Sequence, residues 1–314
     1  MATTTSITTT YAGENAGKMV AVALLSANTI EKGGITVMPN VKFRETVKRL
    51  DVDSVLADGS CDFTATSTIS LTERAIEPKA LQVNLQLCKD SFRSDWDAIS
   101  MGYSAFDELP KSFADFLIGH VSEKVALKME QNIWSGVGTG VNAVSGEFDG
   151  LTTLLALDAN LPTANEIAGG SDILDPSTVV AELAKIVDAI PSALYGRDDL
   201  HIYVSQAVYK AYVRAMNTLG YVDKFNNQST GEMVFDGIKL FVANGLTGAT
   251  AICTTVDNIF FGCGLQNDSN VVKVIDMADI DGSENVRIIM RMTGAVQYYN
   301  VEEIVTYGIT NSAN

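Results

Sequence analysis

The clearest pattern of apolar positions runs from Asp107 to Gly136. One flank of a helix over this range carries an i,i+4 row of Phe113, Leu117, Val121, Val125, Met129 and Ile133, and a second flank carries Phe116, His120, Leu127 and Trp134. The flanks are separated by a polar strip of Asp115, Ser122, Glu123 and Glu130. A helix that is apolar on two sides packs against structure on two sides. The pattern therefore predicts a spine helix along which the chain is arranged, although an ordinary core helix would carry a similar pattern.

Both ends of this helix have a sequence signal. Asp107 is a suitable N-cap, and Pro110 fits the first turn because its missing N–H has no partner there. Gly136, followed by Gly138 and Gly140, ends the helix. Roughly 26 residues at about 1.5 Å each give a rod about 40 Å long.

The chain before this helix changes character twice. Residues 1–16 are rich in Thr and poor in apolar side chains, which indicates an extended arm. A short helix is predicted over residues 15–28, ended by Gly33-Gly34. Strand-like segments follow at Ile35–Pro39, Val41–Val47, Cys61–Leu71 and Leu81–Leu87, and the last of these alternates cleanly enough to lie half buried.

The segment from about Leu50 to Ile76 is polar, rich in Thr and Ser, and poor in large apolar residues. A β-hairpin of this composition has little from which to build its own core. We therefore expect this hairpin to lean on something outside its own domain.

After the spine helix, residues 173–280 alternate helical and strand-like segments and predict a compact block. Two helices begin after the capping groups at Asp175-Pro176-Ser177 and at Ser205. Strands are predicted at His201–Val204, Ala251–Cys253 and Asn258–Phe261, with a hairpin turn at Asp236-Gly237. The tail returns to long strands, the first with Val286, Ile288, Met290 and Met292 on one face and the second over Gln297–Tyr307.

Charge and cysteine content narrow the class of protein. The 314 residues carry a net charge of −16, which argues against a protein whose whole surface binds nucleic acid. The cysteines Cys61, Cys88, Cys253 and Cys263 lie far apart and fit buried thiols in a reducing compartment. The N-terminus lacks the pattern of a secretory signal, and the apolar run Met19–Leu25 is too short to span a membrane. We expect a soluble protein made inside the cell.

Motifs for catalysis and ligand binding fail one by one. Gly13–Met19 resembles a phosphate loop but is one residue short and lacks the Ser or Thr that reaches magnesium. Gly138–Ala143 resembles a dinucleotide loop but follows a helix instead of a strand. Asp279–Gly282 has no ligands at the calcium-loop positions and is interpreted as a turn between strands. Neither His120 nor His201 accompanies a nucleophile elbow. We therefore predict no catalytic, cofactor-binding or metal-binding residue.

The order of these parts resembles that of the major capsid proteins of tailed bacteriophages, the HK97-like family. The resemblance covers nearly the whole chain and depends on the ordering, because each motif alone is weak. After the arm and the hairpin it is carried by Ile133-Trp134-x-Gly136, Asp149-Gly150-Leu151, Leu183–Leu194, Ile202–Ser205, Gln206–Met216, Phe235–Leu240, Phe260-Phe261-Gly262 and the closing strands from Val286.

The resemblance implies an α+β, HK97-like capsid fold. It implies an N-terminal arm over residues 1–39, an extended hairpin loop over 40–80, a peripheral domain over 81–172 and 283–314 that contains the spine helix 107–136, and an axial domain over 173–282. The hairpin would lie over a neighbouring subunit. The chain has no long helical scaffold region before the arm, which implies a separate scaffold protein or none. Nothing supports a covalent cross-link between subunits.

The resemblance also implies function and partners. The chain would self-assemble into hexamers and pentamers of an icosahedral shell around packaged double-stranded DNA, with a portal and decoration proteins as further partners and no membrane. It would be located in the virion, after assembly in the host cytoplasm. An encapsulin shell that encloses cargo enzymes shares this fold and is the first alternative. An α/β hydrolase or nucleotide-binding enzyme is the second, and the failed motifs argue against it.

Charge gives one further expectation. An acidic inner wall would repel packaged phosphates over about one Debye length, near 10 Å at 0.1 M salt. We expect several of Lys18, Lys32, Lys42, Arg44, Lys48, Arg49, Lys111, Lys124 and Lys128 to line the interior. The acidic excess, including Asp198, Asp199 and Asp223, would face outward or lie at subunit contacts. Alternatively, Lys124 and Lys128 pair with Glu123 and Glu130 or with other neighbours on the helix surface.

Overall fold

The computed structural model describes most of the chain. The described residues are 28–41, 43–52, 56, 58, 69–88, 111–218, 233–264, 272–278 and 282–312. The predicted arm over 1–16, nearly all of the predicted helix over 15–28 and the phosphate-loop-like segment 13–19 lie outside them. The described chain begins with α1, Asn28–Glu31, which ends before Gly33 as expected.

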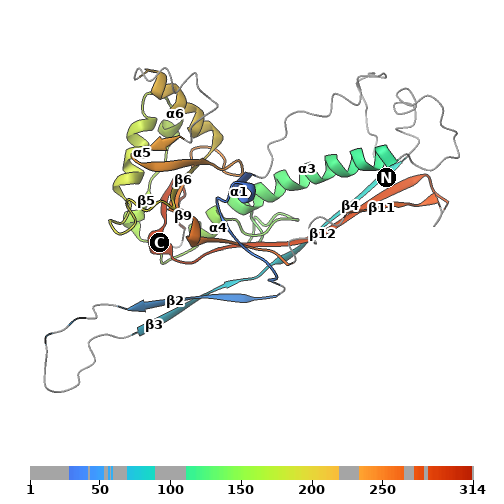
Figure 1. The fold of residues 1–314 in the computed structure, drawn as a ribbon, viewed down its shortest axis with the longest axis horizontal. Helices are drawn as coiled ribbons and strands as arrows, with labels where there is room; N and C mark the ends of the chain where they lie inside the picture. Colours follow the sequence, from blue (N-terminus) through green and yellow to red (C-terminus); the bar gives the residue numbers. More distant parts are fainter. Residues whose placement is uncertain are drawn as a thin grey trace.

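The spine helix is α3, Lys111–Ser135, and Figure 1 shows it as the longest helix of the fold. Gly136 ends it as predicted: a Cβ there would lie 2.3 Å from the carbonyl oxygen of Phe148. The predicted start at Asp107 lies outside the described residues. Among the described side chains of this helix, Val121, Ile133 and Trp134 are buried, whereas Val125 and Leu127 are half-buried.

One assignment on this helix is wrong. The sequence pattern places Glu130 on the polar strip, but its side chain is buried, with 1% of its surface exposed. It contacts Thr29 of α1, which covers the helix where the pattern suggests solvent. Periodicity identifies the polar positions of a helix but not which of them a distant segment covers.

A long sheet extends beside α3 (Figure 1). Its strands run in the order β1 (Thr36–Met38), β10 (Ile259–Gly262), β12 (Asn285–Tyr298) and β11 (Val272–Asp276), and β4 (Lys79–Cys88) also pairs with β12. β4 and β12 are antiparallel, with a register from Asn285 opposite Cys88 to Gly294 opposite Lys79. The predicted face of β12 is confirmed, because Val286, Ile288, Met290 and Met292 are all buried.

A second, six-stranded sheet lies at the other end of the molecule. Its order is β5 (Glu166–Ile167), β13 (Val305–Tyr307), β9 (Ala251–Thr255), β6 (Leu200–Val204), β8 (Ile238–Val242) and β7 (Val234–Phe235). The helices α5 (Val179–Asp188) and α6 (Gln206–Thr218) pack against this sheet through one apolar cluster. The Asp236-Gly237 turn between β7 and β8 is confirmed, with φ of 48° and 81°.

Two expectations about these strands need correction. The predicted strand Gln297–Tyr307 is broken by a short 3-10 helix, η6, over Val301–Glu303, so only Val305–Tyr307 belongs to the six-stranded sheet. Cys88 is exposed, whereas Cys253 and Cys263 are buried as expected and Cys61 lies outside the described residues.

β10 pairs with β1 and β12, so it belongs to the long sheet although neighbouring β9 belongs to the six-stranded sheet.

The two sheets meet around the end of the spine helix. Trp134 and Tyr203 of β6 have ring centroids 5.0 Å apart, and the Tyr203 hydroxyl donates to the carbonyl oxygen of Gly34 at 2.6 Å. The short helix α4 (Leu151–Ala156) packs against α3 in this region. Three short 3-10 helices are also described: η2 (Thr163–Asn165), η3 (Ser171–Leu174) and η4 (Val256–Asn258). Among the described residues no helix is long and apolar enough to cross a membrane.

Candidate assembly site: the hairpin and its root

The strands β2 (Glu45–Val52) and β3 (Ile69–Ile76) form an antiparallel hairpin that projects from the body of the molecule (Figure 1). The sequence predicts a hairpin in this region, and its described strands extend to Val52 and Ile76, past the predicted ends at Val47 and Leu71. Two strands alone are marginally stable in water. The hairpin therefore depends on contacts with other structure, and its two faces differ in the contacts that they make.

One face of the hairpin is apolar and exposed. Directly opposed residues of antiparallel strands share a face, and the register places Leu50 opposite Leu71 and Val52 opposite Ile69. These four side chains, which we call the apolar strip, are 39% to 68% exposed. The strip is bounded by the pair Lys48–Glu73, whose charged atoms are 3.2 Å apart. Nothing in the described part of the chain covers the strip.

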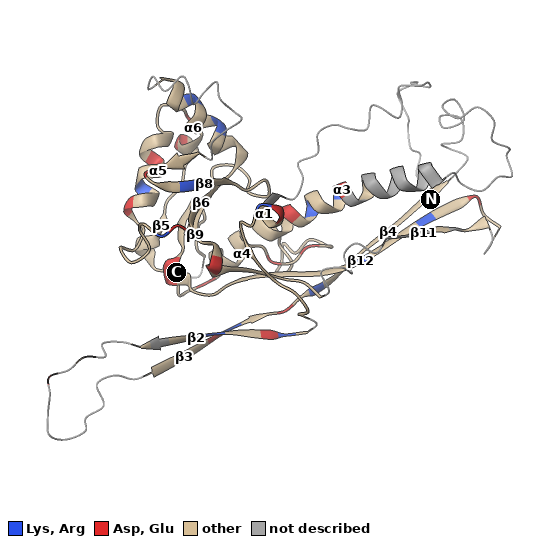
Figure 2. Ribbon diagram, viewed as in Figure 1, with Lys and Arg blue, Asp and Glu red and all other residues tan. Residues whose placement is uncertain are grey.

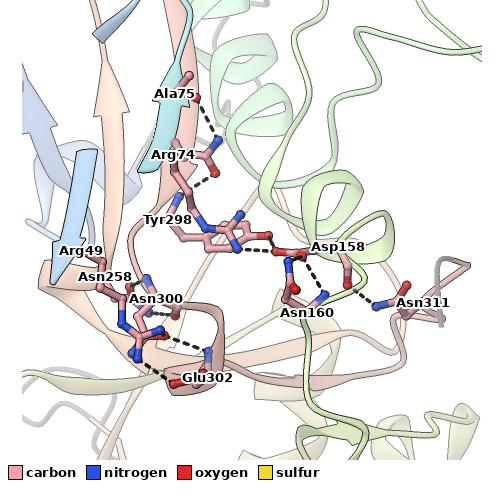
Figure 3. Close-up of polar contacts among 11 residues, drawn as sticks. Arg49, Arg74, Ala75, Asp158, Asn160, Asn258, Tyr298, Asn300, Glu302 and Asn311 are labelled. Atoms are coloured by element: carbon pink, nitrogen blue, oxygen red, sulfur yellow. Dashed lines mark hydrogen bonds and ion pairs between the residues drawn. The ribbon is translucent and has the colours of Figure 1, made fainter. Parts of the chain in front are cut away.

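The opposite face carries two arginines that hold the hairpin to the body. Arg49 donates to Asn300 Oδ1 and to Glu302 Oε2, both at 2.7 Å (Figure 3). Asn300 follows β12 and caps η6 by accepting from the Glu302 amide. Its own backbone is held by a reciprocal pair of bonds with the Asn258 side chain, at 2.7 and 2.8 Å. The acceptor that Arg49 contacts is therefore fixed in place by buried groups.

Arg74 makes the second attachment. Its guanidinium donates to Asp158 Oδ2 at 2.5 Å, and its Cζ atom lies 4.3 Å from the centroid of the Tyr298 ring. The Tyr298 hydroxyl donates to the same carboxylate oxygen at 2.5 Å, and Gln297 Nε2 donates to the Ala75 carbonyl at 3.0 Å. Figure 3 shows Arg74 of the hairpin and Tyr298 of β12 converging on Asp158. We call the two arginines and their partners the root of the hairpin.

The electrostatics of the root favour a charged Asp158. Burial alone would raise the pKa of this carboxyl, but hydrogen bonds from Tyr298, from the Asn160 amide and from Arg74 outweigh burial and lower it. The Tyr298 hydroxyl has a raised pKa because it is buried and donates to Asp158. Both groups are therefore held in the states that form the ion pair and its supporting hydrogen bond.

A small apolar cluster completes the root. Ile76, at the end of β3, is buried against Val41 and Ala295. A Cβ on Gly262 would lie 2.7 Å from Ile76 Cδ1, so this glycine lets the side chain lie directly on β10. The hairpin is thus attached at its root by apolar contact and by two arginines, while its outer face remains uncovered.

Comparison with solved structures identifies the architecture. No protein-family model and no curated protein sequence matches the chain. The fold is similar to the capsid of the native GTA particle, with 15% identity, a TM-score of 0.59 and 90% of each chain covered. It is also similar to a chain of Mycobacterium phage Adephagia, with 13% identity, a TM-score of 0.60, and 98% of this chain and 97% of the other covered. The chain has the HK97-like capsid fold.

A shell protein that is not a phage capsid also matches this chain. The holo-SrpI encapsulin complex from Synechococcus elongatus PCC 7942 matches with 7% identity, a TM-score of 0.57, and 92% of this chain and 89% of that chain covered. The structural similarity therefore identifies the fold. What a shell of this fold encloses has to be determined by other evidence.

Within this HK97-like fold, two of the features singled out in the sequence, His201 and the segment Gly138–Ala143, lie among the described residues. His201 is nearly buried on β6, where its Nδ1 lies 2.9 Å from the Asp199 carbonyl oxygen. Gly138–Ala143 is a loop, as expected. The side chain of His120 and residues 279–281 are outside what the structure describes. Among the described residues, no group of three or more His, Cys, Asp or Glu side chains is placed to hold a metal ion.

The positively charged residues expected on an inner wall have varied partners. Lys48 pairs with Glu73 and Arg49 with Glu302. Lys128 pairs with Glu147, from the loop after the helix, and not with Glu123 or Glu130 of its own helix. Lys18, Lys42 and Asp223 lie outside the described residues, and so does the side chain of Lys111. Figure 2 shows charged residues of both signs along the hairpin, the long sheet and α3.

Sequence reasoning identified the hairpin but missed its root. Asp158 lies in a polar loop, Asn300 between two strands and Arg74 in a strand, and none belongs to a motif. The single available signal was the pair of arginines at positions 49 and 74, which alternation places among polar neighbours of a hairpin. Their partners become visible only when β12 is folded beside the hairpin.

Proposed function

We propose that this chain is the major capsid protein of a tailed phage. It self-assembles into hexamers and pentamers of an icosahedral shell that encloses packaged double-stranded DNA. The observation that carries the proposal is the hairpin: a protruding pair of strands, anchored on one face by Arg49 and Arg74, with the apolar strip exposed on the other. The near-complete mutual coverage with capsid chains supports the same conclusion.

The exposed strip explains why assembly is favourable. Covering four large apolar side chains removes a few hundred Å² of apolar surface from water, at about 25 cal/mol per Å². A subunit that hides the strip against its neighbour therefore gains several kcal/mol for each contact, before the cost of ordering is subtracted. Each subunit both offers a hairpin and receives one, so the contact is heterologous, the type of contact that forms rings when the rotation between subunits closes.

The parts of the chain take the following roles in this proposal. Residues 1–39 are the arm, 40–80 the extended hairpin loop, 81–172 and 283–314 the peripheral domain, and 173–282 the axial domain. The axial sheet is completed by β5 and β13, whose residues come from the peripheral stretches. Other copies of the chain are its main partners. A portal, a separate scaffold, decoration proteins and DNA bound without sequence specificity are the others. The mature location is the virion capsid, after assembly in the host cytoplasm.

Purification and electron microscopy test the proposal directly. We expect megadalton, closed particles, whereas an enzyme of this length would form a small oligomer. A variant in which a short Gly-Ser linker replaces residues 51–73 should remain folded and should form no shells. Small oligomers from the unchanged protein would refute the proposal. Unfolding of the linker variant would show instead that the hairpin belongs to the subunit core.

The encapsulin alternative is favoured by one observation, the similarity to the encapsulin shell from Synechococcus elongatus. It predicts particles that enclose a protein cargo instead of nucleic acid. Nuclease protection of DNA inside particles isolated from the native source, together with terminase and portal genes beside the coding sequence, would support the phage capsid. A peroxidase or ferritin-like gene beside it would support the encapsulin.

A further inference from the structure

The loop from Gly136 to Gly150 follows the spine helix. Its two ends, which we call the base of the loop, are joined by several hydrogen bonds. The Asp149 carboxylate accepts from the Gly138 amide at 2.8 Å, from the Thr139 amide at 3.0 Å and from the Thr139 hydroxyl at 2.8 Å. The Glu147 carboxylate accepts from the Val137 amide at 2.9 Å and pairs with Lys128. The two carboxylates therefore link the beginning of the loop to its end.

Close backbone packing reinforces this base. The Gly150 amide donates to the Gly136 carbonyl at 2.9 Å. A Cβ at Gly136, Gly138 or Gly150 would lie within 2.3 to 2.6 Å of backbone atoms. Glycine is required at these positions because the two arms of the loop approach more closely than any side chain allows. The base therefore has little freedom to move.

The same base is joined to the root of the hairpin. Lys79 is the first residue of β4, three positions after Ile76 ends the hairpin. Its ammonium group donates to the Glu147 carbonyl at 2.7 Å and to the Gly138 carbonyl at 3.2 Å. The loop and the hairpin are therefore supported by one block of the subunit.

The tip of the loop is uncharged and exposed. Residues 139–146, Thr-Gly-Val-Asn-Ala-Val-Ser-Gly, include no acidic or basic side chain. Val141 is 105% exposed, so its side chain contacts nothing else in the described subunit, and Val144 is 47% exposed. Hydrogen bonds from the Ala143 amide to Gly140 and from the Val144 amide to Val137 hold the tip in one shape. Beside it lies a groove of about 490 Å³ that is also lined by Leu157, which is 59% exposed.

We infer that this loop is a preformed contact element whose tip, centred on Val141, is covered by a second copy of the chain. The inference rests on the proposed function. A rigid element loses little conformational entropy on binding, so a held loop binds better than a flexible one of the same composition. Copies of a chain with a net charge of −16 repel one another, and a contact through an uncharged apolar tip adds no carboxylate of the tip to that repulsion. Nucleic acid is not the occupant, because the tip offers no Lys or Arg to phosphate.

Substitution of the tip tests the inference. Val141→Asp should leave the denaturation midpoint of the unassembled subunit unchanged, because the side chain makes no contacts there. It should raise the protein concentration needed for assembly at least about tenfold, since a buried valine contributes roughly that factor and an uncompensated charge adds to it. Val234→Asp, which alters an exposed valine of β7, is the matched control and should shift that concentration less.

A second measurement does not depend on assembly being lost. Val141→Cys and Val234→Cys proteins are assembled and treated with a maleimide, and modification at each position is read by peptide mass spectrometry. The thiol introduced at position 141 should react at least about tenfold more slowly in particles than in dissociated subunits, as expected for a group in a packed contact. The thiol introduced at position 234 should change its rate less.

The outcomes separate this inference from the proposed function. If the unchanged protein forms no particles, the proposed function fails. If particles form, Val141→Asp assembles at the wild-type concentration and the thiol of the Val141→Cys protein reacts equally fast in both states, the loop inference is overturned and the proposed function stands.

Discussion

Thr29 and Glu130 lie 101 residues apart in the sequence and are joined by buried hydrogen bonds from the Thr29 hydroxyl and the Thr29 amide to the Glu130 carboxylate. Trp134 Nε1 donates to the Thr29 hydroxyl at 2.9 Å, so the three groups form one network. None of the described Lys or Arg side chains forms an ion pair with Glu130. The network fixes α1, where the N-terminal segment enters the described structure, against the spine helix.

Removal of the Thr29 hydroxyl should lower the free energy of unfolding. Thr29→Val keeps the shape of the side chain but removes one donor to the Glu130 carboxylate and the hydroxyl that accepts from Trp134 Nε1. Burying such groups unsatisfied costs about 1–3 kcal/mol. We expect a loss of about 2 kcal/mol in the free energy of unfolding, measured by urea denaturation of the subunit. Thr72→Val on the exposed hairpin is the control and should change it by less than about 0.5 kcal/mol.

The same network predicts a pH dependence. Burial raises the pKa of Glu130 above its ordinary value of 4.5, and the hydrogen bonds from Thr29, Trp134 and Gly245 only partly offset this. A raised pKa in the folded state means that the contribution of this group to stability is fully present below pH 4.5 and is lost as pH rises through the folded-state pKa. The Glu130→Gln protein should lack this decline when unfolding free energy is followed across that range. An identical decline in both proteins would assign it to other groups.

The root of the hairpin predicts the opposite dependence. Asp158 has a pKa below its ordinary value of 3.8, so its contribution to stability is present above pH 3.8 and is lost as pH falls through the folded-state pKa. Asp158→Asn should cost about 2 kcal/mol at neutral pH, because Arg74 loses its partner in a partly buried site. Asp199→Asn removes the more exposed pair with Arg197 and should cost less than about 1 kcal/mol. Equal losses in the two variants would show that the root contributes no more than a surface pair.

The two faces of the hairpin should respond differently to one substitution. Leu71 belongs to the apolar strip, and Thr72, its neighbour in β3, lies opposite Arg49 on the other face. Both are exposed, so Leu71→Asn and Thr72→Asn should leave the unfolding of the subunit nearly unchanged. Leu71→Asn alone should reduce the yield of particles, measured by sedimentation. Equal yields would mean that the strip is not the face that neighbours cover.

The charge distribution makes a prediction about the assembled particle. We expect the inner surface to carry several of Lys32, Arg44, Lys48, Arg49 and Lys124, together with the other basic residues named from the sequence. Asp198 and Asp199 should face outward or lie at subunit contacts. Residue-resolved positions in a shell decide the matter, and an inner surface with more carboxylates than these basic groups would contradict the prediction.

Local patterns in the sequence determined most of the elements. Gly136 ends the spine helix, where a Cβ would lie 2.8 Å from the carbonyl oxygen of Asn132 in the preceding turn, and Asp236-Gly237 forms its turn because both residues adopt positive φ. The face of β12 follows from alternation alone, since every second residue points the same way. Each of these signals acts within a few residues, which is why the sequence reveals it.

Tertiary structure decided the features that join distant segments. Glu130 is buried because α1 covers it, and Asp158 becomes the acceptor for Arg74 because β12 brings Tyr298 and the hairpin together. β5 and β13 join a sheet whose other strands lie between them in the sequence. Such contacts depend on partners far away along the chain, because Arg74 and Asp158 are separated by 84 residues in the sequence. Periodicity records which side chains are apolar, whereas only the folded chain decides which polar groups meet.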